Sequence, residues 1–241
     1  MKAAPEAQAA LLTLVDLDAR TRAAETRKRT LPEHEQLNRL NAQRRVLADE
    51  ATKAAIRASD AETAMARTET DLETARTRLQ RDQQRIDDGV VNDARSIGSL
   101  QDEIAHLTGR IAELEDAELE QMMAIEDDRG AAEKAMTAKA DVETQMRALI
   151  ASRDAQIGAA DAEIADLGRQ RSAVASGLPA DLVALFDKAS RAGSGAAEFK
   201  AGRCTGCGLM LDALARRAAE EAPADEVIRC PECGRILVRT V

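Results

Sequence analysis

Apolar residues recur along residues 37–79 in alternating steps of three and four. Eleven of the thirteen positions in this stripe are apolar, and most flanking side chains are charged or amides. The positions are Leu37, Leu40, Arg44, Leu47, Ala51, Ala54, Ala58, Ala61, Met65, Thr68, Leu72, Ala75 and Leu79. A 3.5-residue spacing kept over six heptads predicts a left-handed coiled coil. The small side chains from Ala51 to Ala61 predict a close approach of the partner helix there.

A turn interrupts this stripe between residues 87 and 93. Gly89 and the surrounding Asp and Asn residues are turn formers, and Asn92 or Asp93 can cap the helix that follows. A second stripe then begins, at Ile97, Leu100, Ile104, Leu107, Ile111 and Leu114. The chain therefore reads as two long helices joined by a short turn.

The second stripe does not keep one apolar register. After Leu114 we expect a slip of four residues, because the next apolar pair is Met122 and Ile125 while the continued register holds Glu118 and Gln121. The stripe is blurred between residues 129 and 143 and then resumes. The apolar positions of its last part are Met146, Ile150, Ile157, Ala160, Ile164, Leu167 and Val174.

Helix lengths decide how these helices pair. Pro32 should break the first helix, which splits it into about 6–29 and 33–87, and the second helix covers about 93–176. The two arms have nearly equal lengths about Gly89, which favours an antiparallel hairpin within one monomeric chain over a parallel dimer. In such a hairpin Ala51–Ala61 faces residues 129–143, Ala54 faces about 124–132, and the N-terminus lies beside the C-terminal region.

Composition agrees with a mainly helical protein. Aromatic residues make up 1% of the 241 residues and charged residues 32%, which is typical of long helices and unlike an ordinary globular core. No segment has the roughly 18 to 20 apolar residues of a membrane span, and the N-terminus lacks the apolar core of a signal peptide. We therefore expect a cytoplasmic protein without membrane contact.

The charge is unevenly distributed. The net charge is −9, and residues 191–241, with eight Lys or Arg and seven Asp or Glu, carry +1. Residues 1–190 therefore carry −10. A protein that binds the nucleic-acid backbone usually has a basic stripe, and this sequence shows none.

All four cysteines lie in the last 38 residues, as two C-x-x-C pairs. Cys204 and Cys207 form one pair, Cys230 and Cys233 the other, and Gly208 and Gly234 follow the two pairs. Paired sulfurs two residues apart can reach one metal ion, and two such pairs about twenty residues apart close a tetrahedral shell of four thiolates. This pattern predicts one zinc ion bound by Cys204, Cys207, Cys230 and Cys233. Because four protein ligands leave no open position, the ion should be structural.

Three other uses of these cysteines fit less well. Two disulfides require an oxidising compartment, and a redox C-x-x-C usually stands alone at a helix N-terminus after a strand. An iron–sulfur cluster stays open as an alternative, but the spacing and the Cys-Pro-Glu-Cys-Gly sequence favour zinc.

Catalytic groups are not evident. The two histidines, His34 and His106, lie in charged helical segments and read as solvated surface residues. No nucleophile–base set, phosphate-binding glycine loop or buried carboxylate pair can be assembled, so we expect a protein that is not an enzyme. The apolar residues that follow the cysteine pairs should pack the small C-terminal core. They are Leu209, Met210, Leu211, Leu214, Ile236, Leu237 and Val238.

The arrangement resembles a bacterial family of zinc-ribbon proteins with an N-terminal coiled-coil hairpin, first catalogued as a domain of unknown function. Residues 204–211 and 230–237 carry the most specific similarity, and residues 12–18, 91–116 and 178–186 are also similar. Phe186 and Val238 stand where that family often has Tyr. The resemblance implies a hairpin with a C4 ribbon. Some members act as accessory or chaperone-like factors in flagellar biogenesis, contacting an alternative sigma factor, export components or a flagellar transcript.

The sequence thus predicts a mainly α protein, with a coiled-coil hairpin at residues 1–178 and a short helix plus C4 zinc ribbon at residues 179–241. We interpret it as an adaptor that binds protein partners through both parts. The alternative is a regulatory factor that binds nucleic acid through the ribbon. Its phosphate contacts would come from Arg203, Arg216, Arg217, Arg229, Arg235 and Arg239.

Overall fold

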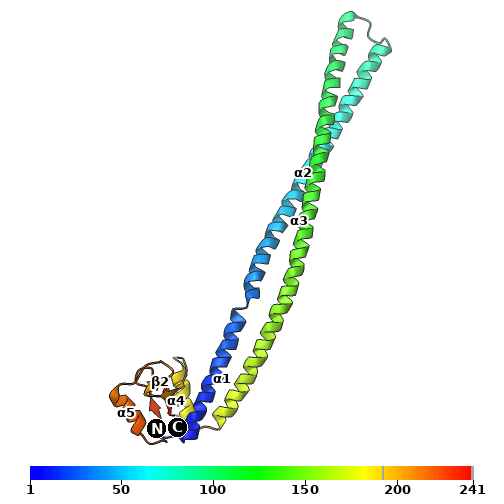
Figure 1. Ribbon diagram of the computed structural model, residues 1–241. Coiled ribbons are helices and arrows are strands. Elements are labelled where there is room, and N and C mark those ends of the chain that lie inside the picture. The colour runs from blue at the N-terminus through cyan, green and yellow to red at the C-terminus, as the bar shows by residue number, and fades with distance from the viewer. Residues whose placement is uncertain (192, 240–241) are drawn as a thin grey trace. The chain divides into compact units, whose positions relative to one another are not determined.

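The computed structural model describes residues 1–191 and 193–239. Its helices are α1 (Pro5–Arg29), α2 (Pro32–Asp87), α3 (Ala94–Ser176), α4 (Ala180–Ser190) and α5 (Ala213–Glu221). Its strands are β1 (Ala196–Lys200), β2 (Arg203–Cys204), β3 (Ile228–Arg229) and β4 (Ile236–Arg239) (Figure 1). The predicted fold class, an antiparallel helical hairpin followed by a small ribbon, is confirmed.

By their contacts the residues form two compact units. One contains residues 1–35 and 150–241, and the other contains residues 36–149. The N-terminal helix therefore belongs with the C-terminal ribbon, and the middle of the hairpin is a unit of its own. The boundary after residue 178 follows the sequence pattern and stays a prediction, because it divides the chain by motif rather than by contact.

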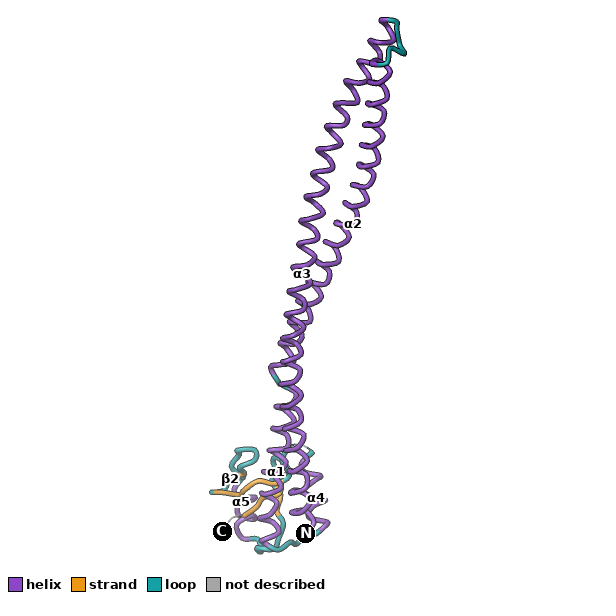
Figure 2. Tube along the Cα trace, turned by 90° about the vertical axis from the view of Figure 1, so that its right-hand side faces the viewer, coloured by secondary structure: helices purple, strands orange, loops and turns teal. Residues whose placement is uncertain are grey.

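In the unit of residues 36–149, α2 and α3 run side by side and antiparallel (Figure 2). All thirteen positions of the first stripe are buried or half-buried. The alanines of this stripe face residues 129–143 of α3, as predicted, with Ala58 lining a hollow together with Ala132 and Ala140. Ala54 lies with Ala131, within the expected range, and with Ala135, slightly beyond it. The turn is asymmetric, because α2 ends two residues before Gly89 and α3 begins five residues after it. This moves the facing residues of α3 three positions beyond a count that is symmetric about Gly89.

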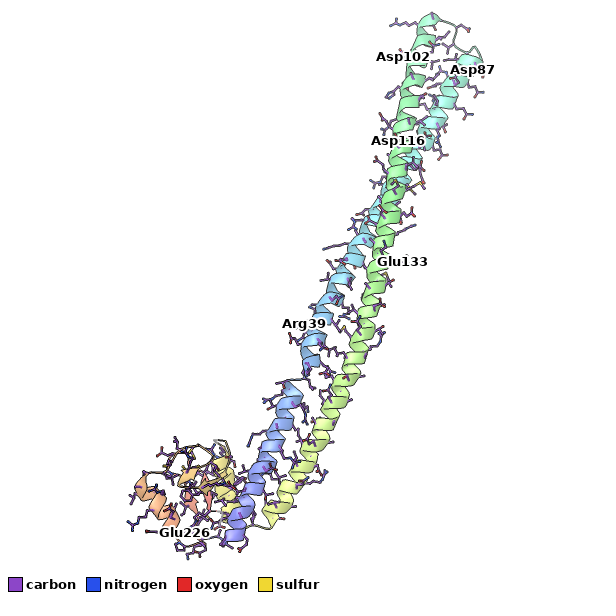
Figure 3. The ribbon with its side chains drawn as sticks, in the orientation of Figure 1. Arg39, Asp87, Asp102, Asp116, Glu133 and Glu226 are labelled. Atoms are coloured by element: carbon purple, nitrogen blue, oxygen red, sulfur yellow. The ribbon has the colours of Figure 1, made fainter. Side chains whose placement is uncertain are left out.

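The turn between α2 and α3 has the expected chemistry. Gly89 has a φ of +64°, a conformation that favours glycine. The Asp93 carboxylate accepts a hydrogen bond of 2.8 Å from the Ser96 N–H, so Asp93 and not Asn92 caps α3. Asp87 and Asp102 mark the two helices next to this turn (Figure 3).

The slip expected after Leu114 is wrong. Gln121 faces the seam and donates a hydrogen bond of 3.1 Å to the Thr68 hydroxyl, while Met122 is 52% exposed. The register therefore continues from Leu114 through Glu118 and Gln121 to the buried Ile125. A polar pair that hydrogen-bonds across the seam avoids the local unwinding that a slip of four residues would need. The Gln121 Oε1 atom is buried without a partner among residues 1–191 and 193–239.

A second polar residue occupies the seam near the turn. Asp82 is 2% exposed and falls between the half-buried Leu79 and Ile86. Arg81 donates two hydrogen bonds to its Oδ1 atom, at 3.1 and 2.9 Å, and Arg85 lies 3.8 Å away. Both arginines come from α2 itself. This arrangement keeps the buried charge paired within one helix.

The break between α1 and α2 follows from Pro32. Proline has no N–H and its ring crowds the carbonyl four residues earlier, which here is that of Lys28. A ring nitrogen of His34 lies 3.3 Å from the Lys28 carbonyl oxygen and replaces the missing donor. His34 is half-buried, so it is not the freely solvated residue that the sequence indicated, whereas His106 is exposed as expected.

In the unit that contains both termini, ion pairs join α1 to the last part of α3. Asp18 accepts a hydrogen bond of 2.6 Å from Arg171, and Lys28 donates one of 2.7 Å to Asp161. Leu17 and Ala24 of α1 are buried, as are Ala160 and Leu167 of α3. These contacts pair α1 with the last part of α3.

The ribbon contains a sheet of four short strands in the order β2-β1-β4-β3. β1 is antiparallel to β2 and parallel to β4, and β3 is antiparallel to β4. Ala201 and Gly202 join β1 to β2, and their φ values of 49° and 74° match a two-residue turn with positive φ at both positions. The first residues of the chain bind to the loop before β3. The Ala3 N–H donates a hydrogen bond to the Asp225 carbonyl, and the Val227 N–H donates one to the Met1 carbonyl.

The two faces of the sheet have different neighbours because side chains alternate along a strand. Ala196, Ile236 and Val238 face one apolar cluster, together with Ala3, Leu11, Leu14, Leu182 and Phe186. Ala197 and Leu237 face the other cluster, which contains Leu211, Cys204 and Cys230. Helices α1 and α4 thus cover one face, and the cysteines cover the other.

The prediction for the apolar residues after the cysteine pairs is confirmed in part. Leu211, Ile236, Leu237 and Val238 are buried in these clusters. Leu209, Met210 and Leu214 are instead 52%, 56% and 82% exposed. Leu209 and Met210 follow the turn at Gly208, and α5 buries Ala219 rather than Leu214. Three of the seven residues thus belong to the surface.

The polar pair in the seam has a measurable consequence. Replacing Thr68→Val together with Gln121→Leu should raise the free energy of unfolding by about 1–3 kcal/mol, because it removes a buried unpaired oxygen and fills the site with apolar atoms. Urea unfolding of the full chain, followed by far-ultraviolet circular dichroism, measures this change. The matched control is a variant that carries the same two changes at exposed positions, Thr70→Val and Gln101→Leu. An unfolding midpoint that falls in the seam variant would contradict the assignment.

Candidate metal centre

The structure brings together all four predicted ligands. The sulfur atoms of Cys204, Cys207, Cys230 and Cys233 all lie within 4.8 Å of one another. Cys204 Sγ is 3.9 Å from Cys233 Sγ, and Cys207 Sγ is 4.0 Å from Cys230 Sγ. A tetrahedral shell with zinc–sulfur bonds of about 2.3 Å has sulfur–sulfur edges of about 3.8 Å. The four sulfurs therefore stand at the separations that a tetrahedral ion requires, and none forms a disulfide.

The two cysteine pairs lie on two backbone turns of the same kind. The Gly208 N–H donates to the Cys204 carbonyl and the Gly234 N–H to the Cys230 carbonyl, both at 2.9 Å. Gly208 and Gly234 have φ values of 75° and 73°, the positive φ that their sequence positions predict. Each turn is closed by a second bond, from the first cysteine's N–H to the carbonyl five residues later, at 3.1 and 2.8 Å. The site thus consists of two matching knuckles.

The surroundings of the cysteine thiols shift their pKa values in different directions. Burial raises the pKa of the Cys230 thiol to about 12, although the N–H groups of Cys233 and Glu232 favour its thiolate. Burial raises the pKa of Cys204 as well. Burial acts in the same direction on Cys233, but hydrogen bonds from the backbone and side chain of Arg235 outweigh it and lower the pKa to about 7. A metal ion must displace protons from the high-pKa thiols, so its binding weakens as pH falls.

Arg235 is the residue that the sequence did not place in this site. Its guanidinium favours the Cys233 thiolate, which in turn raises the pKa of Arg235, and it donates a hydrogen bond of 2.8 Å to the Ser194 hydroxyl. Its side chain crosses the first knuckle so closely that a Cβ on Gly206 would lie 2.6 Å from Arg235 Cδ. A zinc ion with four thiolates carries two negative charges, which a neighbouring guanidinium offsets. The only sequence signal is the position of Arg235 two residues after a ligand.

The donor set fits zinc. Four thiolates in a closed tetrahedron are typical of a structural zinc site, and hydrogen bonds to the sulfurs complete its surroundings. Within residues 1–191 and 193–239 no other group of three Cys, His, Asp or Glu ligand atoms converges in this way. His34 and His106 take no part in the site.

The arginines that the sequence offered as phosphate ligands are mostly engaged within the ribbon. The Arg239 guanidinium donates to five backbone carbonyls between Ala219 and Glu226, at 2.6 to 3.4 Å. Arg203 and Arg229 donate to the carbonyls of Gly208 and Gly234, the knuckle glycines. Arg217 pairs with Glu221 at 2.7 Å. Most of these charges therefore hold the ribbon's own loops.

Family comparisons agree with this geometry. A model of the CT398-like coiled coil hairpin domain matches residues 14–194, which is more than half of the chain. The chain belongs to this family. A second model, of the C4-type zinc ribbon domain, matches residues 203–237 and includes all four cysteines. The chain thus combines a CT398-like hairpin with a C4-type zinc ribbon and its four-cysteine metal-binding site.

Relatives of similar length share this arrangement. The uncharacterized protein Rv2229c of Mycobacterium tuberculosis is 30% identical over 246 residues, which covers 99% of this chain and 98% of the relative. A solved structure from Mycobacterium smegmatis has a TM-score of 0.85 at 29% identity, with both chains fully covered. CT398 from Chlamydia trachomatis has a TM-score of 0.73 at 14% identity over 98% of both chains, and this likeness shows the fold alone.

The family's frequent tyrosines are absent at two positions of this chain without loss of packing. Phe186 is fully buried and Val238 is 1% exposed, both in the cluster beneath α1. Neither position leaves a polar group to satisfy.

Among the described residues, no helix combines the length and the apolar character needed to cross a membrane.

We expect the zinc content to depend on Arg235. The purified chain should hold one zinc per molecule by elemental analysis, and Arg235→Gln should lower zinc affinity by about tenfold or more, as loss of a charge near metal ligands commonly does. The pH at which half the zinc is released should rise, since the Cys233 thiolate loses the group that lowers its pKa. Competition with a chromophoric chelator across pH measures both effects.

The matched control is Arg217→Gln, which removes the same charge from the exposed face of α5. It should release zinc at the wild-type pH. Equal shifts in the two variants would mean that net charge alone matters. Iron in place of zinc would contradict the metal assignment.

Proposed function

We propose that this protein is a non-enzymatic cytoplasmic adaptor whose hairpin and zinc ribbon bind protein partners, and whose one zinc ion is structural. The observation that carries the proposal is a group of exposed apolar side chains on an otherwise charged helical surface. Leu119, Met122 and Met136, on one face of α3, are 52% to 63% exposed. Large apolar side chains that gather on a solvated surface mark interaction sites.

The ribbon adds a second exposed apolar group. Leu209, Met210 and Leu214 lie next to the first knuckle and are all more than half exposed. The metal-binding turn holds Leu209 through the hydrogen bond between its carbonyl and the Cys204 N–H. In this proposal the zinc ion has no chemical step to perform, and it fixes the loop that presents these side chains. The chain acts as a monomer in which the hairpin closes on itself.

The alternative, a nucleic-acid-binding regulator, has weaker support. Of the six ribbon arginines, Arg216 is exposed, and its guanidinium forms no ion pair or hydrogen bond among the described residues; its side chain lies against Gly202. Stacking platforms for bases are also scarce, because the two aromatic residues are the buried Phe186 and the half-buried Phe199. Residues 1–190 carry −10 and repel phosphate.

Two measurements on the full chain separate these functions. A photo-crosslinking residue placed at Leu119 or Leu214 should capture proteins in the native cells, and nuclease treatment should leave the captured bands unchanged. The exposed polar position Gln101 serves as the control and should capture little. Labelled RNA and DNA should bind weakly at 150 mM salt, because any backbone contact falls steeply with ionic strength.

Nucleic-acid binding would replace the adaptor function if RNA or DNA bound with submicromolar affinity at 150 mM salt and Lys200→Gln with Arg216→Gln abolished this binding. These two cations are exposed and can be removed without breaking the loops that Arg229, Arg235 and Arg239 hold. Capture that disappears after nuclease treatment would point the same way.

A further inference from the structure

Two adjoining hollows on one side of the hairpin form a single furrow. Both are lined by Glu62, Arg129 and Glu133, and both lie between α2 and α3 in the unit of residues 36–149. The furrow follows α2 from Ala55 to Met65 and α3 from Met122 to Ala140. We call this the acidic furrow. Figure 3 marks its α3 wall at Glu133, and Asp116 lies on the same helix.

The acidic furrow is open because its α2 wall is low. Ala55, Ala58 and Ser59 supply short side chains on that wall. The α3 wall instead carries Met122 and Met136, which are 52% and 63% exposed. Leu119, three residues before Met122, continues the same helix face and is 60% exposed. Unbranched methionine side chains can adjust to the shape of an apolar partner.

The charge around the acidic furrow is strongly negative. Residues 113–128 contain eight Asp or Glu and no Lys or Arg. Arg129, the one cation among the furrow's lining residues, donates to Glu62 at 3.1 and 2.7 Å and is thereby neutralised. Glu126 and Glu133 line the furrow, and neither forms an ion pair within the part of the chain that the structure describes. Two unpaired carboxylates thus border the exposed methionines.

The opposite side of the seam lacks this excess of negative charge. The hollow there is lined by three cations, Lys53, Arg57 and Lys134, and by Glu50. Lys53 pairs with Asp49 at 2.7 Å and Arg57 with Asp128 at 2.5 Å. The charges on this side that remain unpaired among the described residues, those of Glu50 and Lys134, therefore balance. A cationic partner would therefore be drawn to one side of the hairpin and not to the other. This difference favours a positively charged occupant of the acidic furrow.

We propose that the acidic furrow binds a basic amphipathic helix of a partner protein, which packs as a third helix against α2 and α3. The inference rests on the adaptor function proposed above and names the partner's chemistry. An apolar stripe on that helix would cover Met122 and Met136, and its Lys or Arg residues would pair with Glu126 and Glu133. The furrow's α3 wall, from residue 122 to 140, is about 27 Å long, which accommodates a helix of roughly 18 residues.

A second copy of this chain is a poor occupant by the same reasoning. The chain has a net charge of −9, and residues 113–128 would bring further acids to an acidic surface. Like charges placed side by side at an interface disfavour association.

The test uses a defined probe and the full chain. The probe is a fluorescent 18-residue peptide with Leu at helical i, i+3, i+4 and i+7 spacing and Lys at most other positions, titrated at 150 mM salt. Met122→Gln with Met136→Gln should weaken its binding by about tenfold or more, because two apolar anchors are lost. Glu126→Gln with Glu133→Gln should weaken binding and reduce its dependence on salt.

Matched controls lie on the same helix outside the acidic furrow. Met123→Gln and Glu120→Gln change exposed residues that line neither hollow, and both should bind the peptide as the unaltered chain does. A peptide of the same composition with its Leu residues scattered around the helix should bind much more weakly. Circular dichroism confirms that each variant keeps its helical content.

Three results would overturn the proposal. Equal losses in the furrow and control variants would mean that the peptide responds to net charge alone. Equal binding of the scattered peptide would exclude a helical apolar face. A dimer in sedimentation velocity that Met122→Gln with Met136→Gln dissociates would make a second copy the occupant. Each result leaves the adaptor function standing if nuclease-resistant protein capture persists, so the two proposals fail separately.

Discussion

The fold depends on one apolar cluster that is shared by the two ends of the chain. Leu11 and Leu14 of α1 pack with Leu182 and Phe186 of α4 against Ile236 and Val238 of β4. Phe186, one of the two aromatic residues, is fully buried there. Because α1 begins the hairpin and β4 ends the ribbon, neither module has its complete set of contacts without the other. The backbone bonds of Met1 and Ala3 to residues 225–227 extend the same junction. Burial at this junction offsets the shortage of aromatic core elsewhere in the chain.

The four cysteines and an apolar cluster occupy opposite faces of one small sheet. β1 and β4 alternate their side chains between the cluster under α1 and the cluster around the cysteines. A sheet of such short strands has little stability alone, and in the function proposed above a zinc ion held by the four thiolates stabilises its second face. Arg235 lies across the first knuckle and links the sulfurs to Ser194, at the entrance to β1. The metal ion is thereby coupled to the segment that connects the ribbon to α4.

The sequence predicted the features that follow from repetition or from single strong residues. The heptad positions of α2, the break at Pro32, the turn at Gly89 and the four cysteines all lie where their patterns indicate. Apolar counting failed at Gln121, because a polar residue can occupy a seam position when a hydrogen-bonding partner is within reach. It also failed at Met122 and Leu214, where apolar side chains are exposed. The roles of His34, Arg235 and Arg239 depend on carbonyls and sulfurs that only the folded backbone brings near them, so residue type alone could not reveal them.

The shared cluster can be tested most directly by hydrogen exchange on the full chain, with and without the Cys230→Ser substitution. If the cluster joins α1 to the ribbon, loss of the metal site should speed exchange in residues 196–239 and also in residues 5–17 of α1 and in α4. Residues 100–125 of α3, in the other unit, should exchange as before. Faster exchange confined to residues 196–239, with α1 unchanged, would contradict the account and make the ribbon an independent module.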